Sequence, residues 1–308
     1  MTYGIIDVGS NTIRLNLYQY EQEKLSLLLS KKYNAGLAGH VNGGSLTPRG
    51  IQLAIDTLNA CRDICENFRV EHVSVFATAS LRNIVNTDEV IRILRAKTGY
   101  AVDLISGEEE ARLDFLGATH ALNIQDGVLV DIGGGSTELV RYREGKLEEA
   151  VSLPIGSLNL FCSYVKEGVL PTTSELRDIR DRAEDELEQV SSVLAGENPV
   201  LCGVGGTVRA VHKLSCRWFN HDPAECCVTA DEIQMLYKRC KKADRALLME
   251  ILKSTPDRIH TLTPGLTVLR SVVRAAGGQV VHVSSFGIRE GYLYDRVLPG
   301  ASRTGKEL

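Results

Sequence analysis

Two glycine-containing turns in this sequence carry groups that can bind phosphate. Glycine has no Cβ, so the backbone N–H groups of such a turn can approach an anion closely. Hydroxyl side chains in both turns add further donors. An aspartate that ends the preceding apolar segment would lie beside a bound phosphate and could hold Mg²⁺ directly or through water. The turns consist of Gly9, Ser10, Asn11 and Thr12 after Asp7, and of Gly133, Gly134, Gly135, Ser136 and Thr137 after Asp131.

Three consecutive glutamates, Glu108, Glu109 and Glu110, form a second group of candidate residues. Hydrolysis of a phosphoanhydride needs a base that activates water, and one of these carboxylates could supply it. A structural interpretation also fits, since Ser106 and Glu109 have capping-box spacing and acidic residues are favoured in the first turn of a helix. Glu138, at the end of the second glycine turn, is another candidate carboxylate.

Two further segments are ambiguous on sequence alone. Arg82 follows a predicted strand and could clamp a phosphate, but a solvated surface arginine fits equally well. The turn 203–208 joins a strand to a helix and could either accept an anion or allow close packing. The histidines and cysteines between His212 and Cys227 do not have the spacing of a zinc site.

The elements that must position these residues repeat along the chain. Each glycine turn separates two apolar segments, which predicts a strand, a turn and a return strand. One such hairpin opens each half of the chain, and alternating strands and helices follow it. Helices are predicted from Thr47-Pro48, over 88–97, 106–122 and 174–194, and after the Thr229 and Thr263 start signals. The sequence thus predicts a duplicated two-lobed α/β protein with a boundary near 123–127.

Composition excludes several classes of protein. The chain has 308 residues, 44% hydrophobic and 24% charged, and no apolar run of the length that a membrane span needs. The net charge of −4 gives no overall basic field for nucleic acid, so we expect neither a nucleic-acid nor a membrane partner. The N-terminal segment does not resemble a signal peptide, and the eight cysteines have no disulfide-scaffold spacing. We therefore expect a cytoplasmic protein with reduced thiols.

Taken together and in order, four motifs resemble those of the exopolyphosphatase/guanosine pentaphosphate phosphohydrolase (Ppx/GppA) family. The segments are 6–14, 77–82, 105–112 and 131–138, and the later segments 203–210, 264–266 and 287–291 agree with them. The resemblance spans nearly the whole chain.

This resemblance implies two ribonuclease-H-like lobes of the actin/sugar-kinase/chaperone ATPase superfamily around a deep interlobe cleft. The lobes would comprise residues 1–123 and 124–308, with the last helix packing back on the first lobe. By position, Glu110 matches the family's catalytic glutamate and Glu138 its second active-site glutamate. Asp7 and Asp131 match the metal-site aspartates, which implies Mg²⁺. The family's tendency to dimerise favours a homodimer.

The resemblance leaves the substrate open. The expected activity is release of terminal phosphate from inorganic polyphosphate, and the nearest alternative is the same reaction on guanosine pentaphosphate. A non-catalytic sensor of phosphorylated nucleotides is another alternative, and an ATP-dependent kinase ranks lower because no acceptor site is recognisable. Two departures bear on the choice. We expect the short, two-domain type of the family, without the further C-terminal helical domain of longer members, and the loop 33–44 is nearly uncharged where members often carry arginine.

Overall fold

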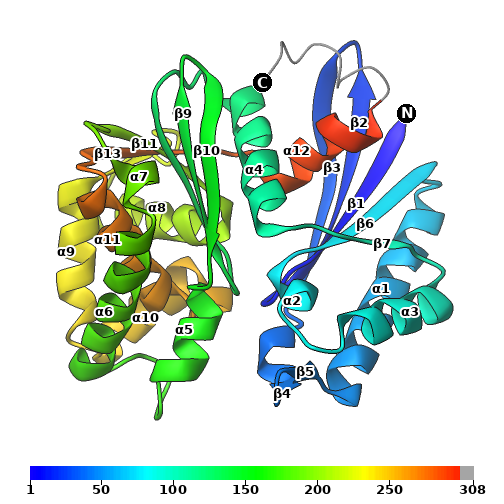
Figure 1. Cartoon of the computed structure of the whole chain (residues 1–308), viewed down its shortest axis with the longest axis horizontal. Coiled ribbons are helices and arrows are strands. Elements are labelled where there is room, and N and C mark those ends of the chain that lie inside the picture. Colours follow the sequence, from blue (N-terminus) through cyan, green and yellow to red (C-terminus); the bar gives the residue numbers. More distant parts are fainter. Residues whose placement is uncertain (299–308) are drawn as a thin grey trace. The chain divides into compact units, whose positions relative to one another are not determined.

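The computed structural model describes residues 1–298, which form two compact units. The first unit is Met1–Ser106, and the second begins at Gly107 and contains the rest of the described residues. In Figure 1 the chain of the first unit runs from blue to cyan and that of the second from green to red. None of the helices in the described part of the chain is long and apolar enough to cross a membrane.

A five-stranded sheet forms the centre of the first unit, in the order β3-β2-β1-β6-β7. Strands β1, β2 and β3 are antiparallel, and β6 and β7 continue parallel to β1. The elements of this unit are β1 (Thr2–Val8), β2 (Ile13–Glu21), β3 (Lys24–Tyr33), η1 (Leu37–His40), β4 (Val41–Asn42), β5 (Ser45–Leu46), α1 (Pro48–Asn67), β6 (His72–Ala77), α2 (Ala79–Arg82), α3 (Thr87–Thr98) and β7 (Val102–Leu104).

Alternation along β1 separates the two faces of this sheet. Ile6 and Val8 are fully buried in a cluster that includes Leu58 of α1 and Leu94 of α3. Successive strand residues point to opposite faces, so Asp7 lies on the face away from α1 and α3. Helix α1 begins as predicted, because Thr47 accepts a hydrogen bond from the Gly50 N–H at 3.3 Å and Pro48 takes the first helical position.

The second unit repeats this strand order and adds one edge strand, giving β10-β9-β8-β11-β13-β12. Its strands are β8 (Gly127–Ile132), β9 (Thr137–Arg143), β10 (Lys146–Leu153), β11 (Val200–Val204), β12 (Cys227–Thr229) and β13 (Val280–Val283). Its helices are α4 (Gly107–Ala121), α5 (Ser157–Tyr164), α6 (Thr173–Gln189), α7 (Ser191–Leu194), α8 (Gly205–Phe219), α9 (Ala230–Cys240), α10 (Arg245–Ser254), η2 (Pro256–Arg258), α11 (Leu262–Ala275), α12 (Ile288–Tyr292) and η3 (Leu293–Val297). Two sheets with this order confirm the predicted ribonuclease-H-like lobes.

Helices cover both faces of the second sheet. Val128, Val130 and Ile132 of β8 pack in a large cluster with residues of α6, α8 and α11. Leu129 belongs instead to a smaller cluster with Phe115 of α4. Helix α4 thus lies on one face of the sheet and α6, α8 and α11 on the other, as Figure 1 shows.

Helix α4 is also held by the short helix α12, which contacts it closely (Figure 1). A Cβ on Gly117 would lie 2.2 Å from the carbonyl oxygen of Gly287, and one on Gly291 would lie 1.9 Å from the carbonyl oxygen of Leu113. Only glycine permits backbones to approach so closely.

Because α4 packs on the second sheet, the two units divide at Ser106, earlier in the chain than the boundary predicted at residue 123.

The sequence also predicted one helix over 174–194, whereas the structure has two. Helix α6 ends at Gln189 and α7 begins at Ser191, with Val190 between them at φ −120° and ψ 31°, outside the helical region.

The capping boxes at Thr172 and Thr229 both form, with Glu175 and Glu232 at the third helical position of each helix. Of these two start signals, only Thr229 was recognised from the sequence.

Candidate active site

The second glycine turn is a closed loop between β8 and β9. The N–H of Gly133 donates to the carbonyl oxygen of Ser136 at 2.9 Å, and Asp131 faces Glu138 across the two strands. The first glycine turn has the same construction, since the N–H of Gly9 donates to the carbonyl oxygen of Thr12 at 3.0 Å. The turns therefore correspond in backbone geometry as well as in sequence.

Helix α5 fixes the orientation of the second turn. The N–H groups of Ser157 and Leu158 donate to the carbonyl oxygens of Gly133 and Gly134, both at 2.9 Å, and the side-chain amide of Asn159 donates to that of Gly135 at 2.9 Å. In a planar trans peptide the carbonyl and the following N–H point in opposite directions. The N–H groups of Gly134, Gly135 and Ser136 thus point away from α5, as an anion-binding turn requires.

The first turn is held in the same manner by the loop that follows β3. The carbonyl oxygens of Ser10 and Asn11 accept hydrogen bonds from the N–H groups of Ala38 at 3.1 Å and Gly36 at 2.9 Å. The N–H groups of Asn11 and Thr12 accordingly face the other side. The uncharged loop noted in the sequence supplies backbone donors that support the turn.

Four carboxyl groups gather on the α4 face of the second sheet. Strand alternation places Asp131 and Glu138 on the same face as Leu129 and Val140, which pack against α4. Glu110 and Asp114 are one helical turn apart on α4 and are both buried. The Oγ of Ser152 donates to Glu138 at 2.8 Å.

Asp114 is the fully buried member of this cluster, and the other carboxyls shift its pKa. Burial raises the pKa of its carboxyl well above the ordinary value, and the negative charges of Asp131, Glu110 and Glu138 raise it further. The backbone N–H of Ile288 acts in the opposite direction. Asp131, Glu110 and Glu138 are thus close enough to Asp114 to affect its ionisation. Asp114 is a member of the cluster that the sequence did not reveal, although its i, i+4 spacing from Glu110 was a usable signal.

The three consecutive glutamates have different surroundings. Glu108 is exposed, and Glu109 accepts hydrogen bonds from Arg112 at 2.8 and 2.9 Å. Hydrogen bonds from Arg112, with a further contribution from Arg296, lower the pKa of Glu109. Arg112 also pairs with Asp295 at 2.7 Å, which joins α4 to the segment after α12. Of the three, only Glu110 is buried with the other carboxyls.

The start of α8 lies directly beside Asp131. Gly205 has φ +75°, and a Cβ there would lie 1.9 Å from Oδ1 of Asp131. Thr207 donates its hydroxyl to the carbonyl oxygen of Ile132 at 2.6 Å, which ties α8 to the end of β8. The turn whose role was ambiguous in the sequence is therefore adjacent to the carboxylate cluster.

The remaining candidate residues have the following places. In the first unit, Asp7 faces Arg14 across the hairpin, and Arg82 donates to the carbonyl oxygen of Ile105 at 2.9 Å. In the second unit, Ser136 is buried, and the Thr137 hydroxyl is engaged by the carbonyl oxygen of Ile155. Thr137 is therefore a residue whose side chain supports the turn. The structure brings together Glu110, Asp131 and Glu138 with the second turn, and Asp7 with the first.

The carboxylates suit a hard cation such as Mg²⁺. Within residues 1–298 no three His, Cys, Asp or Glu side chains are arranged as a complete metal-binding cluster. Mg²⁺ in phosphate-transferring sites commonly uses only one or two carboxylates together with water and substrate phosphates. Asp131 is separated from the second glycine turn by Ile132 alone, so its carboxylate could serve as such a ligand beside a phosphate bound at that turn.

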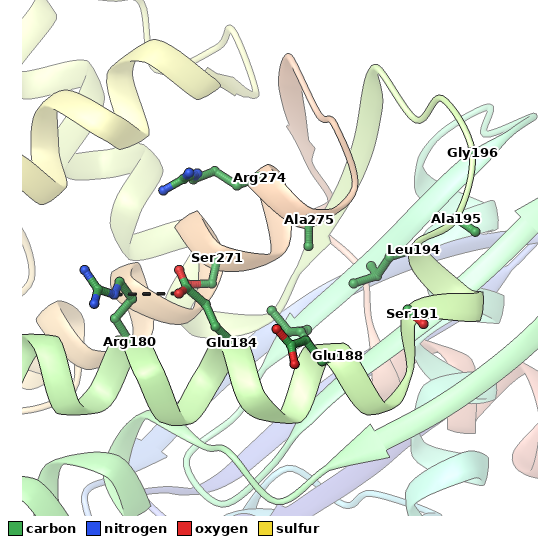
Figure 2. A pocket seen from close by; sticks show the side chains of 11 residues that line it. Arg180, Glu184, Glu188, Ser191, Leu194, Ala195, Gly196, Ser271, Arg274 and Ala275 are labelled. Atoms are coloured by element: carbon green, nitrogen blue, oxygen red, sulfur yellow. Dashed lines mark ion pairs between the residues drawn. The ribbon is translucent and has the colours of Figure 1, made fainter.

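A separate cavity of about 550 Å³ lies between α6, α7 and the C-terminal end of α11 (Figure 2). Arg180 and Glu184 form an ion pair at 3.7 Å along its wall, and Arg274 lies on α11 beside it. None of the candidate catalytic residues lines this cavity. It is therefore distinct from the carboxylate cluster.

The two sheets, each with a glycine turn next to a strand-terminal aspartate, define a protein built from two ribonuclease-H-like units. Comparison with known proteins gives the family. The model of the Ppx/GppA phosphatase family matches residues 17–299, so the chain belongs to this family and the resemblance seen in the sequence is confirmed. It is a hydrolase that acts on phosphoric anhydrides.

Solved structures agree with this assignment. The crystal structure of the Aquifex aeolicus member of the Ppx/GppA family is 27% identical, with a TM-score of 0.77 over 95% of this chain and 96% of that one. Its type II variant has 27% identity and a TM-score of 0.73 over 97% and 100%. An exopolyphosphatase from Cytophaga hutchinsonii is similar in fold, with 21% identity and a TM-score of 0.85 over 96% and 97%.

Proposed function

We propose that this chain is an exopolyphosphatase that hydrolyses the terminal phosphoanhydride of inorganic polyphosphate and releases orthophosphate. The observation that carries the proposal is the burial of the Glu110 carboxyl in a cluster with Asp131 and Glu138, at strand ends that lead into the second glycine turn. Burial of several carboxyls together costs free energy, and such clusters are concentrated at functional sites. Turnover of a phosphoanhydride is a function that needs a base of this kind.

In the proposed reaction Glu110 accepts a proton from an attacking water. The water oxygen forms a bond to the terminal phosphorus, and the bond from that phosphorus to the bridging oxygen breaks. The electron pair of the broken bond leaves with the shortened chain, and orthophosphate is released. The N–H groups of Gly134, Gly135 and Ser136 would bind oxygens of the phosphate on which charge develops. In the first unit, Asn11 and Thr12 offer a second set of N–H donors, and Arg82 is a further proposed phosphate ligand.

Asp131 is the proposed Mg²⁺ ligand of the second unit and Asp7 that of the first. When bound, Mg²⁺ would neutralise negative charge on the phosphate oxygens. Glu138, held by the Ser152 hydroxyl, is the second active-site carboxylate, and its place opposite Asp131 suits it to orient a water molecule.

The test is release of orthophosphate, in the presence of Mg²⁺, from short polyphosphate, long polyphosphate and guanosine pentaphosphate. Glu110→Gln should lower kcat by about 10²- to 10⁴-fold, as loss of a general base does. Glu109→Gln is the matched control, because it changes the neighbouring carboxylate that pairs with Arg112, and it should keep near-normal turnover. Near-normal activity of a folded Glu110→Gln variant would overturn the mechanism.

The three substrates decide among the alternatives. Release from guanosine pentaphosphate alone would replace the proposed substrate by the nucleotide. Tight nucleotide binding without release from any substrate would show a sensor.

We also place the enzyme in the cytoplasm, since all eight cysteines are free thiols, as expected in a reducing compartment. The proposed homodimer is checked by measuring the mass of the protein in solution.

A further inference from the structure

The cavity between α6, α7 and the C-terminal end of α11 has an unsatisfied hydroxyl group in its wall. Ser271 of α11 lines the cavity, points toward α6 (Figure 2) and is only 2% exposed. Its Oγ has no hydrogen-bond partner within residues 1–298. A buried hydroxyl without a partner costs free energy, so a ligand that bonds to it would be favoured here.

The preceding residue, Arg270, is a buried cation without a counterion. It is 8% exposed, its Nε donates to Oε1 of Gln234 at 2.6 Å, and its guanidinium lies 4.4 Å from the ring centroid of Tyr237. In the described part of the chain its Nη1 has no hydrogen-bond partner, and no carboxylate forms an ion pair with it. Buried charges are usually paired, so this arginine favours an anion nearby.

A second arginine without a counterion lies at the same end of the cavity. Arg274 lines the cavity one helical turn after Arg270, and it too has no ion pair among the described residues. Arg180, by contrast, is paired with Asp181 at 2.9 Å and with Glu184 at 3.7 Å. The charges of Arg274, Glu184 and Arg180 all act on Arg270, which places these groups close together. Two positive charges therefore remain unpaired at this end.

The rest of the lining includes an apolar surface on a fixed support. Leu187 and Leu194 line the cavity and are themselves almost fully buried. The side-chain amide of Asn198 donates to the carbonyl oxygens of Leu194 at 3.1 Å and Gly196 at 3.3 Å, which holds this wall in place. The volume of about 550 Å³ is in the range of sites that bind small organic molecules.

We infer that this cavity is a binding site for a small organic anion that has one carboxylate and an apolar body. The carboxylate would lie at the arginine end, where a guanidinium can donate two parallel hydrogen bonds to its oxygens. Arg274 is exposed to such a ligand, Ser271 offers its hydroxyl, and the buried charge of Arg270 adds to the attraction. The apolar body would cover Leu187 and Leu194.

The acidic residues of the lining favour a carboxylate over a phosphate. Glu184 and Glu188 of α6 line the same cavity. A phosphate monoester carries about 1.5 to 2 negative charges at pH 7, so these residues would repel it more strongly than they repel a singly charged carboxylate. The inference does not depend on the proposed hydrolysis, since none of the candidate catalytic residues lines this cavity.

The experiment measures binding of naphthoate to the full chain by calorimetry, in parallel with its uncharged amide and with naphthyl phosphate. Naphthoate has one carboxylate and an apolar body, the amide keeps the shape without the charge, and the phosphate ester carries the larger charge. We expect naphthoate to bind about 10-fold or more tightly than the amide, the range for loss of a hydrogen bond to a charged group.

Two substitutions in the wall test the location of the site. Arg274→Gln should raise the Kd for naphthoate about 10-fold, and Ser271→Ala should raise it about 3-fold or more, as expected for a charged and a neutral hydrogen bond. Arg177→Gln is the matched control, because Arg177 is an exposed arginine of α6 that does not line the cavity. It should leave the Kd unchanged. Urea unfolding establishes that each variant is folded.

The outcomes decide the inference in either direction. Naphthoate binding that is weakened in Arg274→Gln and Ser271→Ala but not in Arg177→Gln would support it. Absence of naphthoate binding, or binding that both wall variants leave unchanged, would overturn it. Equal affinity for the amide would overturn the assignment to an anion, and tighter binding of naphthyl phosphate that depends on Arg274 would overturn the assignment to a carboxylate.

Discussion

Replacing Gly205 by alanine should disable the carboxylate cluster without unfolding the protein. A Cβ at this position would lie 1.9 Å from Oδ1 of Asp131, whereas real Cβ contacts are not found below 3.0 Å. The carboxylate must therefore retreat by 1.1 Å or more, the difference between these two distances. A misplacement of about 1 Å in an active site can cost about 100-fold in rate, equivalent to about 2.7 kcal/mol.

The substitution also strains the backbone, and this effect must be measured separately. Gly205 has φ +75°, where a residue with a Cβ costs about 1 to 2 kcal/mol. Gly277 is the matched control, because it has φ +68° and no atom within 4 Å of its Cβ position. Gly277→Ala should lower the free energy of unfolding by a similar 1 to 2 kcal/mol and leave activity unchanged.

The assay is kcat/KM for tripolyphosphate together with urea unfolding of both variants. We expect kcat/KM to fall about 100-fold in Gly205→Ala and less than twofold in Gly277→Ala. Near-wild-type activity of both variants would refute the reasoning, because it would mean that the position of Asp131 does not matter. An equal loss of activity in both variants would also refute it, because backbone strain alone would then explain the loss.

Two other predictions follow from the buried ionisable groups. The pKa of Asp114 is raised in the folded state by burial and by Asp131, so its contribution to stability is fully present below the unfolded pKa of about 3.9 and is lost as pH rises through the folded pKa. The free energy of unfolding of Asp114→Asn relative to wild type should therefore increase with pH above about 4, and a pH-independent difference in urea titrations would contradict this. Burial raises the pKa values of Cys61, Cys202 and Cys240 to about 12, so about one thiol in 10,000 is ionised at pH 8. Iodoacetamide should modify the exposed Cys226 in the folded protein and these three only after unfolding, as peptide mass spectrometry would show; rapid labelling of Cys240 would be inconsistent with its burial.

The local features of this fold could be predicted from the sequence because each has a short-range signal. The two hairpins were recognised from the matching order of apolar segment, aspartate and glycine turn, and the structure confirms both. The start of α1 was recognised from Thr47 and Pro48. These signals reside in a few adjacent residues and do not depend on tertiary contacts.

The features that the sequence did not reveal depend on long-range packing. The unit boundary was placed after α4 because nothing in 107–121 indicates which sheet covers its apolar face. Nor could the sequence show that Gly36 and Ala38 support the first turn or that Asn159 supports the second, since backbone and amide donors leave no pattern.

The close contact between α4 and α12 has a consequence for synthesis of the protein. The helix that carries Glu110 is fixed by glycine contacts to Gly287 and Gly291, which the ribosome adds long after α4 has emerged. Contacts between segments so far apart in the chain form late, because the intervening loop must first be closed. A nascent chain can therefore fold its first unit early while α4 still lacks its partner. The helix that carries the proposed base therefore reaches its final position only after Gly291 has been added to the chain.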